Sequence, residues 1–113
     1  MSLDLDALQA RLRAFAAERR WEPFHTPKNL SMALMVEAAE LAEIFQWMTP
    51  EQSLAAREDP QLKEPIADEV ADVLLYLLQI ADRAGVDLAW AVENKLRKNA
   101  EKYPLPGSSS QQK

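Results

Sequence analysis

Two pairs of carboxylates have the spacing of neighbours on a helix. Glu37 and Glu40 lie in "VEAAELAE", and Glu69 and Asp72 lie in "DEVADV". Side chains three residues apart project from adjacent turns, so each pair faces one side of its helix. Glu37 also falls on an apolar stripe, where an unpaired charge is costly. The other members of this stripe are Leu30, Leu34, Leu41, Phe45 and Met48.

Packing of the two acidic helices would bring the four carboxylates to one place, where they need a cation. The chain has no Cys, and oxygen-only ligands select a hard metal, Mg²⁺ or alternatively Mn²⁺. A di-iron site would require Glu-x-x-His on two helices, and the single histidine, His25, lies in a predicted loop. The ordinary alternative is that acidic residues on helices are solvated, and Glu43, Asp68 and Asp82 fit it.

A cationic face in the C-terminal part of the chain is the complement of the acidic pairs. Lys95 and Lys102 are candidates for binding phosphate oxygens, with Lys95 placed to stabilise charge during a reaction. Each could instead extend to solvent. Asn99 and Tyr103 share this side of the helix with the apolar residues Leu88, Val92 and Leu96.

The loop "WEPFHTPKN" concentrates residues suited to binding a base. Trp21, His25 and Trp47 are candidates for a wall on which a nucleobase stacks. The alternative is that aromatic rings at helix ends belong to the core, and that is the expectation for Trp90.

The elements that must position these residues are helices. Only two Gly occur in 113 residues, with abundant Ala, Leu, Glu and Arg, which favours an all-α fold. We expect one domain over residues 1–104 and a disordered polar tail over 105–113. The expected helices are 4–19, 28–48, 63–84, ended by Gly85, and 87–103, with a minor helix capped by Thr49.

The third helix predicts a homo-oligomer. Its apolar residues form one broad face, yet Leu75 points the opposite way, and two buried sides in a short chain indicate a second subunit. A single exposed Leu is the alternative. The residues of the broad face are Val70, Val73, Leu74, Leu77 and Ile80.

The overall charge and hydropathy exclude some partners. A net charge of −5 argues against nucleic-acid binding, because phosphate contacts need a basic surface. No apolar run reaches the length of a membrane span, and the segment "MSLDLDALQA" lacks a signal-peptide pattern. We therefore expect a cytoplasmic protein with no nucleic-acid or membrane partner.

The chain resembles the all-α nucleoside triphosphate pyrophosphohydrolases, the MazG-like superfamily, and within it the dCTP pyrophosphatase branch. The matching segments are "FAAERRWEPFHTPKNL", "EAAELAEIFQW", "DEVADVLLYLLQIA" and "VDLAWAVENKLRKNAEKYP". The resemblance implies hydrolysis of a (deoxy)nucleoside triphosphate to the monophosphate and pyrophosphate, as in cleansing of the nucleotide pool. It also implies a four-helix-type bundle completed by homo-oligomerisation, with a dimer of dimers favoured over a dimer.

The resemblance also implies roles for single residues. Glu37, Glu40, Glu69 and Asp72 match the family's Mg²⁺ ligands. The positions that match contacts to phosphate, sugar and base are Trp21, His25, Asn29, Trp47, Tyr76, Lys95, Asn99, Lys102 and Tyr103.

Three alternatives remain open from the sequence. The segment "MTPEQSLAAREDPQLKEP" reads more like bacterial relatives than animal dCTP enzymes, so the base preference is open. The chain could be a broad-specificity NTP pyrophosphatase or act on a nucleotide such as phosphoribosyl-ATP. It could also be a non-catalytic helical binding module, which would have no use for Glu37 within an apolar stripe.

Overall fold

The computed structural model describes residues 1–107, and every regular element in that range is helical. The all-α prediction is therefore confirmed for this part of the chain. Of the predicted tail, residues 108–113 lie outside the described residues. In chain order the elements are α1 (Leu5–Glu18), the 3₁₀ helix η1 (Glu22–Phe24), α2 (Pro27–Phe45), α3 (Pro50–Ala55), the 3₁₀ helix η2 (Ala56–Glu58), α4 (Pro60–Arg83) and α5 (Leu88–Lys102).

Side-chain caps explain where the α-helices begin. Each of the five N-cap residues accepts a hydrogen bond from a backbone N–H of the first turn, which is otherwise without a partner. The expected cap at Thr49 is present and forms a capping box with Gln52. Asp59 caps α4 and Pro60 follows it at the first helical position, so α4 begins earlier than predicted. The other caps are Asp4, Thr26 and Asp87.

Two helices end on a left-handed residue. Gly85, with φ of +71°, ends α4 as predicted, and the N–H of Val86 donates to the carbonyl of Ala81 at 2.8 Å. α1 ends in the same way, but its left-handed residue is Arg20, with φ of +57°. Trp21 follows Arg20 directly, and its N–H donates to the carbonyl of Ala16 at 2.9 Å.

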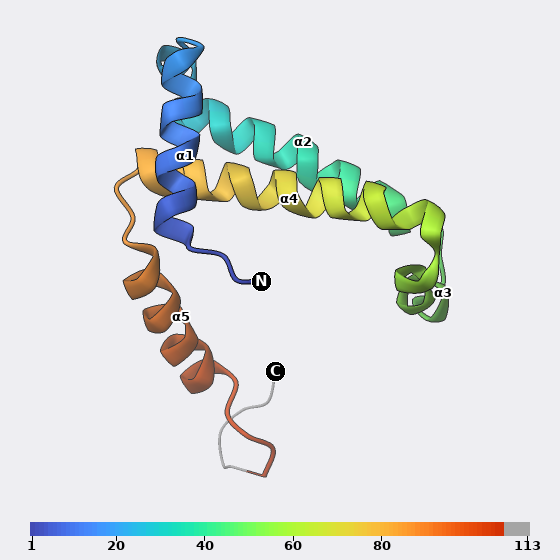
Figure 1. Cartoon of the computed structure of the whole chain (residues 1–113). Helices are drawn as coiled ribbons and strands as arrows, with labels where there is room; N and C mark the ends of the chain where they lie inside the picture. Colours follow the sequence, from blue (N-terminus) through green and yellow to red (C-terminus); the bar gives the residue numbers. More distant parts are fainter. Residues whose placement is uncertain (108–113) are drawn as a thin grey trace.

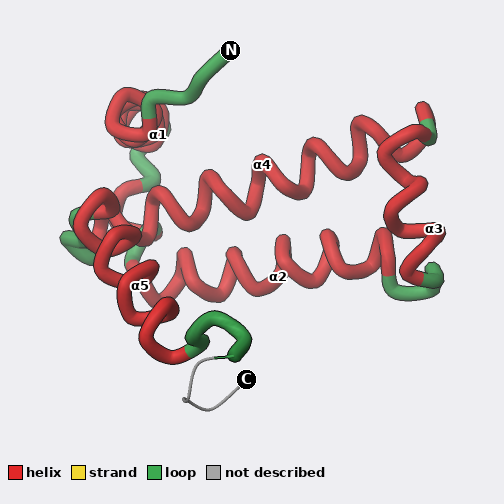
Figure 2. The backbone as a smooth tube through the Cα atoms, turned by 90° about the horizontal axis from the view of Figure 1, so that it is seen from below, coloured by secondary structure: helices red, strands yellow, loops and turns green. Residues whose placement is uncertain are grey.

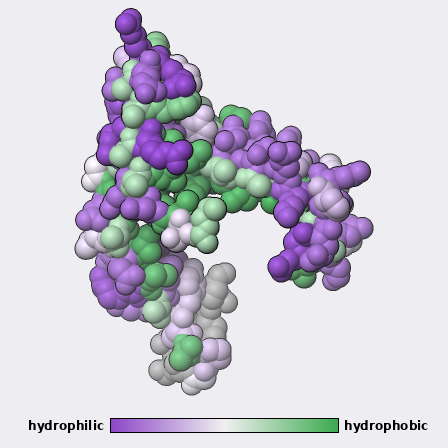
Figure 3. Space-filling view, viewed as in Figure 1, coloured by the Kyte–Doolittle hydropathy of each residue, from purple (hydrophilic) through white to green (hydrophobic). Residues whose placement is uncertain are grey.

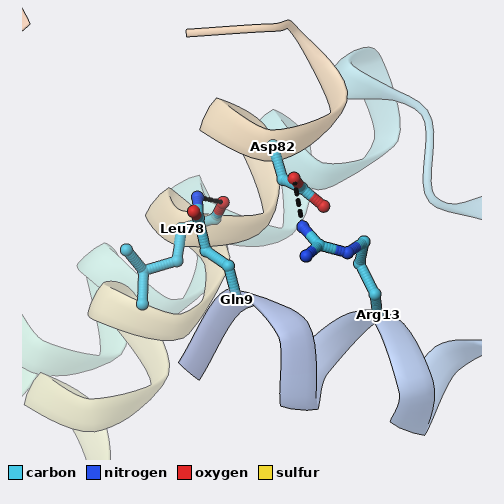
Figure 4. Close-up of polar contacts among 4 residues, drawn as sticks. All are labelled: Gln9, Arg13, Leu78 and Asp82. Atoms are coloured by element: carbon cyan, nitrogen blue, oxygen red, sulfur yellow. Dashed lines mark hydrogen bonds and ion pairs between the residues drawn. The ribbon is translucent and has the colours of Figure 1, made fainter. Parts of the chain in front are cut away.

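The body of the protein is an antiparallel pair, α2 against α4, with α3 at one end and α1 crossing α4 at the other (Figures 1 and 2). Polar contacts fix the crossing, as Figure 4 shows. Gln9 donates to the carbonyl of Leu78 at 2.9 Å, and Arg13 pairs with Asp82 at 2.6 Å. Asp82, expected to be a solvated charge, therefore ties α1 to α4.

Few side chains are fully buried, and these lie chiefly where α1, α2 and α4 meet. The buried apolar residues are Ala16, Leu30, Ala56, Leu78 and Ala81. The stripe predicted for α2 agrees with this, because Leu30 faces the core and Leu34 and Leu41 are half-buried. Glu37 in the same stripe is also half-buried.

Three expectations about apolar packing were wrong for the single chain. Leu75 is half-buried against α1, whereas Val70 and Leu77, assigned to the buried face of α4, are 51% and 47% exposed. Trp90 is 65% exposed rather than in the core. Trp90 is exposed because α5 leads away from the other helices instead of packing along them (Figure 1).

The chain is consequently more open than a closed four-helix bundle. Its radius of gyration is 17.7 Å, whereas a compact domain of this length has about 13 Å. Figure 3 shows apolar surface along the inner side of the bend between the α2–α4 pair and α5. None of the helices in residues 1–107 combines the length and the apolar character that a membrane span needs.

Candidate active site

Three of the four predicted carboxylates meet between α2 and α4. Glu37 and Glu40 from α2 and Glu69 from α4 each offer one carboxylate oxygen, and these three atoms lie within 4.8 Å of one another. We call these residues the acidic cluster. It forms because α2 and α4 pack side by side, so that the two i, i+3 pairs face each other.

The electrostatics of the cluster are unfavourable without a cation. The pKa of Glu37 rises from 4.5 to about 7, chiefly through a hydrogen bond with Glu69 and then through partial burial. The negative charges of Glu40, Asp72 and Glu69 raise it further. Crowded carboxylates share protons or bind a cation, because they cannot all be anionic in a partly dry space.

One oxygen of the cluster has no partner. Oε1 of Glu69 is buried, and no hydrogen-bond donor within the described residues reaches it. A buried unpaired carboxylate oxygen is costly, and a divalent cation would satisfy it. The donor set is made of oxygen atoms alone, which suits Mg²⁺ or Mn²⁺, so the residues present fit such an ion.

Asp72 lies beside the cluster rather than within it. Its charge acts on Glu37, but its oxygens are not among the three that converge. Instead Asp72 is half-buried and lines a cleft between α1 and α4. It therefore connects the acidic cluster with this cleft.

The cleft has aromatic walls and a volume of about 180 Å³. Three of the residues predicted to contact the base or sugar, Trp21, His25 and Tyr76, come together in it. The lining residues are Leu12, Phe15, Ala16, Trp21, His25, Asp72, Leu75, Tyr76 and Gln79. Known ligand pockets span roughly 300–1,000 Å³, so this cleft is large enough for part of a nucleotide.

Contacts between rings hold Trp21 at the cleft. Its ring meets that of Phe15 edge-on, with centroids 5.7 Å apart, and that of His25 at 5.8 Å. The guanidinium carbon of Arg19 lies 3.4 Å from the centroid of Phe15 and 5.9 Å from that of Trp21. Aromatic and cation–π contacts of this kind orient a ring as well as stabilising it.

Asn29 supports the loop and is not among the residues that line the cleft. Its side-chain Nδ2 donates to the carbonyl of Phe24 at 2.9 Å, and its backbone N–H donates to Oγ1 of Thr26 at 3.1 Å. The bond to Phe24 anchors η1 on the first turn of α2, and the bond to Thr26 caps that helix, so together they help to fix the position of His25, which lies between η1 and α2.

The acidic cluster and the cleft are joined by one stripe of α4. Glu69, Asp72, Tyr76 and Gln79 follow one another at spacings of three and four residues, so they share a face of the helix. Along the axis the stripe rises roughly 15 Å, which is comparable to an extended nucleoside triphosphate. Gln79 was missed in the sequence, although its spacing continues the stripe. Phe15 was assigned only to the apolar face of α1.

The remaining predicted residues are not brought to this place within one chain. Trp47 is 89% exposed and follows the C-terminal end of α2, roughly 27 Å along that helix from the end beside Trp21. The others lie on or just after α5, where three are exposed and Asn99 is half-buried: Lys95, Asn99, Lys102 and Tyr103.

Comparison with known proteins agrees with the all-α fold. The MazG-like family model matches residues 32–113. A pyrophosphatase from Archaeoglobus fulgidus, solved by crystallography, superposes with a TM-score of 0.82 at 38% sequence identity. The match covers 93% of this chain and 96% of that one.

Curated relatives with a similar degree of sequence identity are dCTP pyrophosphatases. The chain is 45% identical over 96 residues to dCTP pyrophosphatase 1 of Rattus norvegicus and 47% identical over 103 residues to that of Homo sapiens. These matches cover 84% and 88% of this chain. The chain spans 56% and 61% of the length of these two relatives.

Proposed function

The chain belongs to the MazG-like family, and on that premise we propose that it hydrolyses a deoxynucleoside triphosphate, dCTP ahead of others, to the monophosphate and pyrophosphate. The names of its curated relatives support this choice of substrate. The observation that carries the proposal is the acidic cluster, with the unpaired Oε1 of Glu69, joined by Asp72 to an aromatic cleft.

Glu37, Glu40, Glu69 and Asp72 are the residues that would hold Mg²⁺, with Mn²⁺ as the substitute. When bound, such an ion neutralises charge on the phosphate oxygens and on the pyrophosphate that leaves. Glu40 is the exposed member of the cluster, so its carboxylate is free to orient a water molecule for attack on phosphorus. The sequence has no Cys and offers no Ser–His–Asp arrangement, so we do not expect a covalent intermediate on an enzyme nucleophile.

The cleft would hold the base and part of the sugar. The exposed face of Trp21 offers a stacking surface, and Tyr76 and His25 offer polar groups at its edge. Asn29 contributes by holding the loop that carries His25.

A second copy of the chain would complete the site. The apolar surfaces of α2, α4 and α5 need cover, and the cleft alone is small for a nucleotide. In this arrangement a homo-oligomer, with a dimer of dimers favoured, brings Trp47 of one subunit to the cleft of another. The α5 residues reach the phosphates in the same way: Lys95, Asn99, Lys102 and Tyr103.

The test is pyrophosphate release from the eight common NTPs and dNTPs and from 5-methyl-dCTP, in Mg²⁺ and in EDTA. The proposal expects Mg²⁺-dependent release led by dCTP or its 5-methyl derivative. Comparable rates on many bases would replace the dCTP assignment with a broad-specificity enzyme. Absence of release from every substrate would contradict the proposed activity and favour a binding module.

A further inference from the structure

Gln79 stands at the end of the α4 stripe that is remote from the acidic cluster. Its half-buried side chain lines the cleft together with Phe15, Trp21 and Tyr76. Among the described residues that line the cleft, Gln79 is the one amide. Its position therefore puts a neutral polar group beside the ring surfaces on which a base would stack.

The orientation of this amide follows from its contact with the backbone. Nε2 of Gln79 donates to the carbonyl oxygen of Leu75 at 3.1 Å. A carbonyl only accepts hydrogen bonds, so the NH₂ group must face Leu75 and Oε1 must be directed away from it. No N–H or O–H group in residues 1–107 donates to Oε1, and the atom is not sealed from solvent. Gln79 thus has a free acceptor available to a ligand.

A lone acceptor distinguishes among the bases. Cytosine carries an amino donor at the ring position where uracil and thymine carry a carbonyl acceptor. An acceptor on the protein attracts the amino group and repels the carbonyl. Adenine also carries an amino group, so a lone acceptor separates cytosine from uracil and thymine and does not separate it from adenine.

The neighbouring polar groups do not make this distinction. The Tyr76 hydroxyl and the His25 ring can each donate or accept, so they can bond to either kind of base. Asp72 is also an acceptor, but it sits at the other end of the stripe, where its charge acts on Glu37.

We propose that Gln79 determines the specificity for cytosine, with its Oε1 accepting a hydrogen bond from the 4-amino group of the base. This inference rests on the proposed function, because it assigns the residue that selects among nucleotide substrates at the same site.

The test compares dCTP with dUTP, which differ only in the group at position 4 and the proton at N3. Gln79→Met removes the acceptor and keeps an unbranched side chain of similar length. We expect the ratio of kcat/KM for dCTP over dUTP to fall roughly three- to tenfold, the usual worth of one hydrogen bond. The variant should lose turnover of dCTP and keep or gain turnover of dUTP, because the repulsion of the uracil carbonyl is removed. Retained turnover of dUTP therefore also shows that the variant is folded.

Gln9→Met is the matched control. Gln9 makes the same type of bond, from Nε2 to the carbonyl of Leu78 at 2.9 Å, but does not line the cleft. Its replacement should leave the dCTP to dUTP ratio unchanged.

The outcomes separate this inference from the proposed function. A wild-type enzyme that prefers dCTP while Gln79→Met keeps the same ratio would overturn the role of Gln79 and leave the activity standing. An equal loss of preference in Gln9→Met would also overturn it, because the effect would then be structural. If no triphosphate is hydrolysed, binding of dCMP and dUMP, measured by calorimetry, decides: a preference for dCMP that Gln79→Met abolishes supports the role, and equal binding overturns it.

Discussion

At the scale of residues, Glu37 links the cost of burying a charge to the binding of a cation. Its carboxyl is half-buried in the α2 stripe, next to Glu69 and near Glu40 and Asp72. These neighbours and partial burial raise its pKa to about 7, so in the metal-free protein about half of the Glu37 carboxyls carry a proton at neutral pH. A cation that binds the cluster must displace this proton.

The first prediction concerns pH. Because the pKa of Glu37 is raised on folding, its contribution to the stability of the metal-free protein is present below pH 4.5 and is lost as the pH rises through about 7. Mg²⁺ competes with the proton, so the rise in Tm on adding Mg²⁺ should be larger at pH 8 than at pH 6. Thermal scans at both pH values measure this difference.

Calorimetry of Mg²⁺ binding at pH 6.5, in buffers of different ionisation enthalpy, should also detect proton release. Glu37→Gln is the control, because it has no proton to lose and should abolish that release. Binding without any proton release in the wild-type protein would contradict the protonated state of Glu37.

Single residues were predictable where spacing alone decides their position. The two i, i+3 carboxylate pairs and the link to Tyr76 follow from helical geometry, and the structure places Glu37, Glu40 and Glu69 together. Phe15 and Gln79 were not foreseen as cleft residues. Their places depend on the angle at which α1 crosses α4, which no local pattern encodes.

At the scale of elements, α1 and α4 end with the same left-handed backbone conformation, formed by two different types of residue. Both helices end on a residue with positive φ, Arg20 in α1 and Gly85 in α4. Glycine adopts this conformation freely, whereas a residue with a Cβ is strained there. Arg20 directly precedes Trp21, which lines the cleft. The strained conformation of Arg20 therefore sets the direction in which the chain reaches this wall of the cleft.

The second prediction concerns substitutions at these two left-handed positions. Arg20→Gly should raise the free energy of unfolding by about 1 kcal/mol, and Gly85→Ala should lower it by a similar amount. No atom lies within 4 Å of a Cβ built on Gly85, so the cost there would come from φ alone. Urea unfolding at one fixed protein concentration measures both changes.

Arg20→Ala serves as the control, because it removes the Arg side chain and keeps the Cβ. It should not reproduce the gain of Arg20→Gly. Equal stability of the Gly and Ala variants would show that the left-handed conformation is not the source of the strain.

Helix boundaries were predictable to the extent that caps are local. Thr49, Asp87 and Gly85 act as the sequence indicated. The start of α4 was predicted three residues late, because Asp59 followed by Pro60 is itself a cap and first-turn signal. The direction of α5 was not predictable, because its apolar residues do not say which surface they cover.

At the scale of the whole molecule, the chain leaves much apolar surface uncovered. Several large side chains on α2, α4 and α5 are about half exposed or more, among them Met32, Met35, Val36, Val70, Trp90, Val92 and Leu96. Exposed apolar side chains that gather on one face are typical of an interface. In our proposal a second copy covers this surface and also brings Trp47 and the α5 residues to the site.

The third prediction tests the shared site by mixing variants. Glu37→Gln subunits lack an acidic-cluster ligand, and Trp47→Ala subunits lack a ring that we assign to the cleft of a neighbour. Each variant alone should be weakly active at low dCTP. Mixed oligomers should recover activity, because random assembly of pairs leaves about a quarter of the sites with both residues intact.

The matched control mixes Glu37→Gln with Asp72→Asn, whose residues belong to the same half of the site. That mixture should recover nothing. Co-assembly without recovery in the Trp47→Ala mixture would contradict a contribution of Trp47 from a second subunit.

A homo-oligomer was predicted from the width of the apolar face of α4 and stays a prediction, but one residue on which it rested is placed differently in the structure. Leu75, the residue that suggested it, packs against α1, and the exposed surface lies on Val70, Leu77 and α5 instead. Helical periodicity gives the number of apolar faces and does not assign them to contacts within or between chains.

The most direct test of the central claim is the Mg²⁺ dependence of pyrophosphate release from dCTP in three proteins: wild type, Glu37→Gln and Asp68→Asn. Asp68 is exposed on α4 beside Glu69, so its variant removes a nearby charge that is outside the acidic cluster. We predict Mg²⁺-dependent release in the wild type and Asp68→Asn, and a loss of roughly a hundredfold or more in Glu37→Gln. Turnover of dCTP by Glu37→Gln at a near-normal rate and with an unchanged Mg²⁺ dependence would contradict the account.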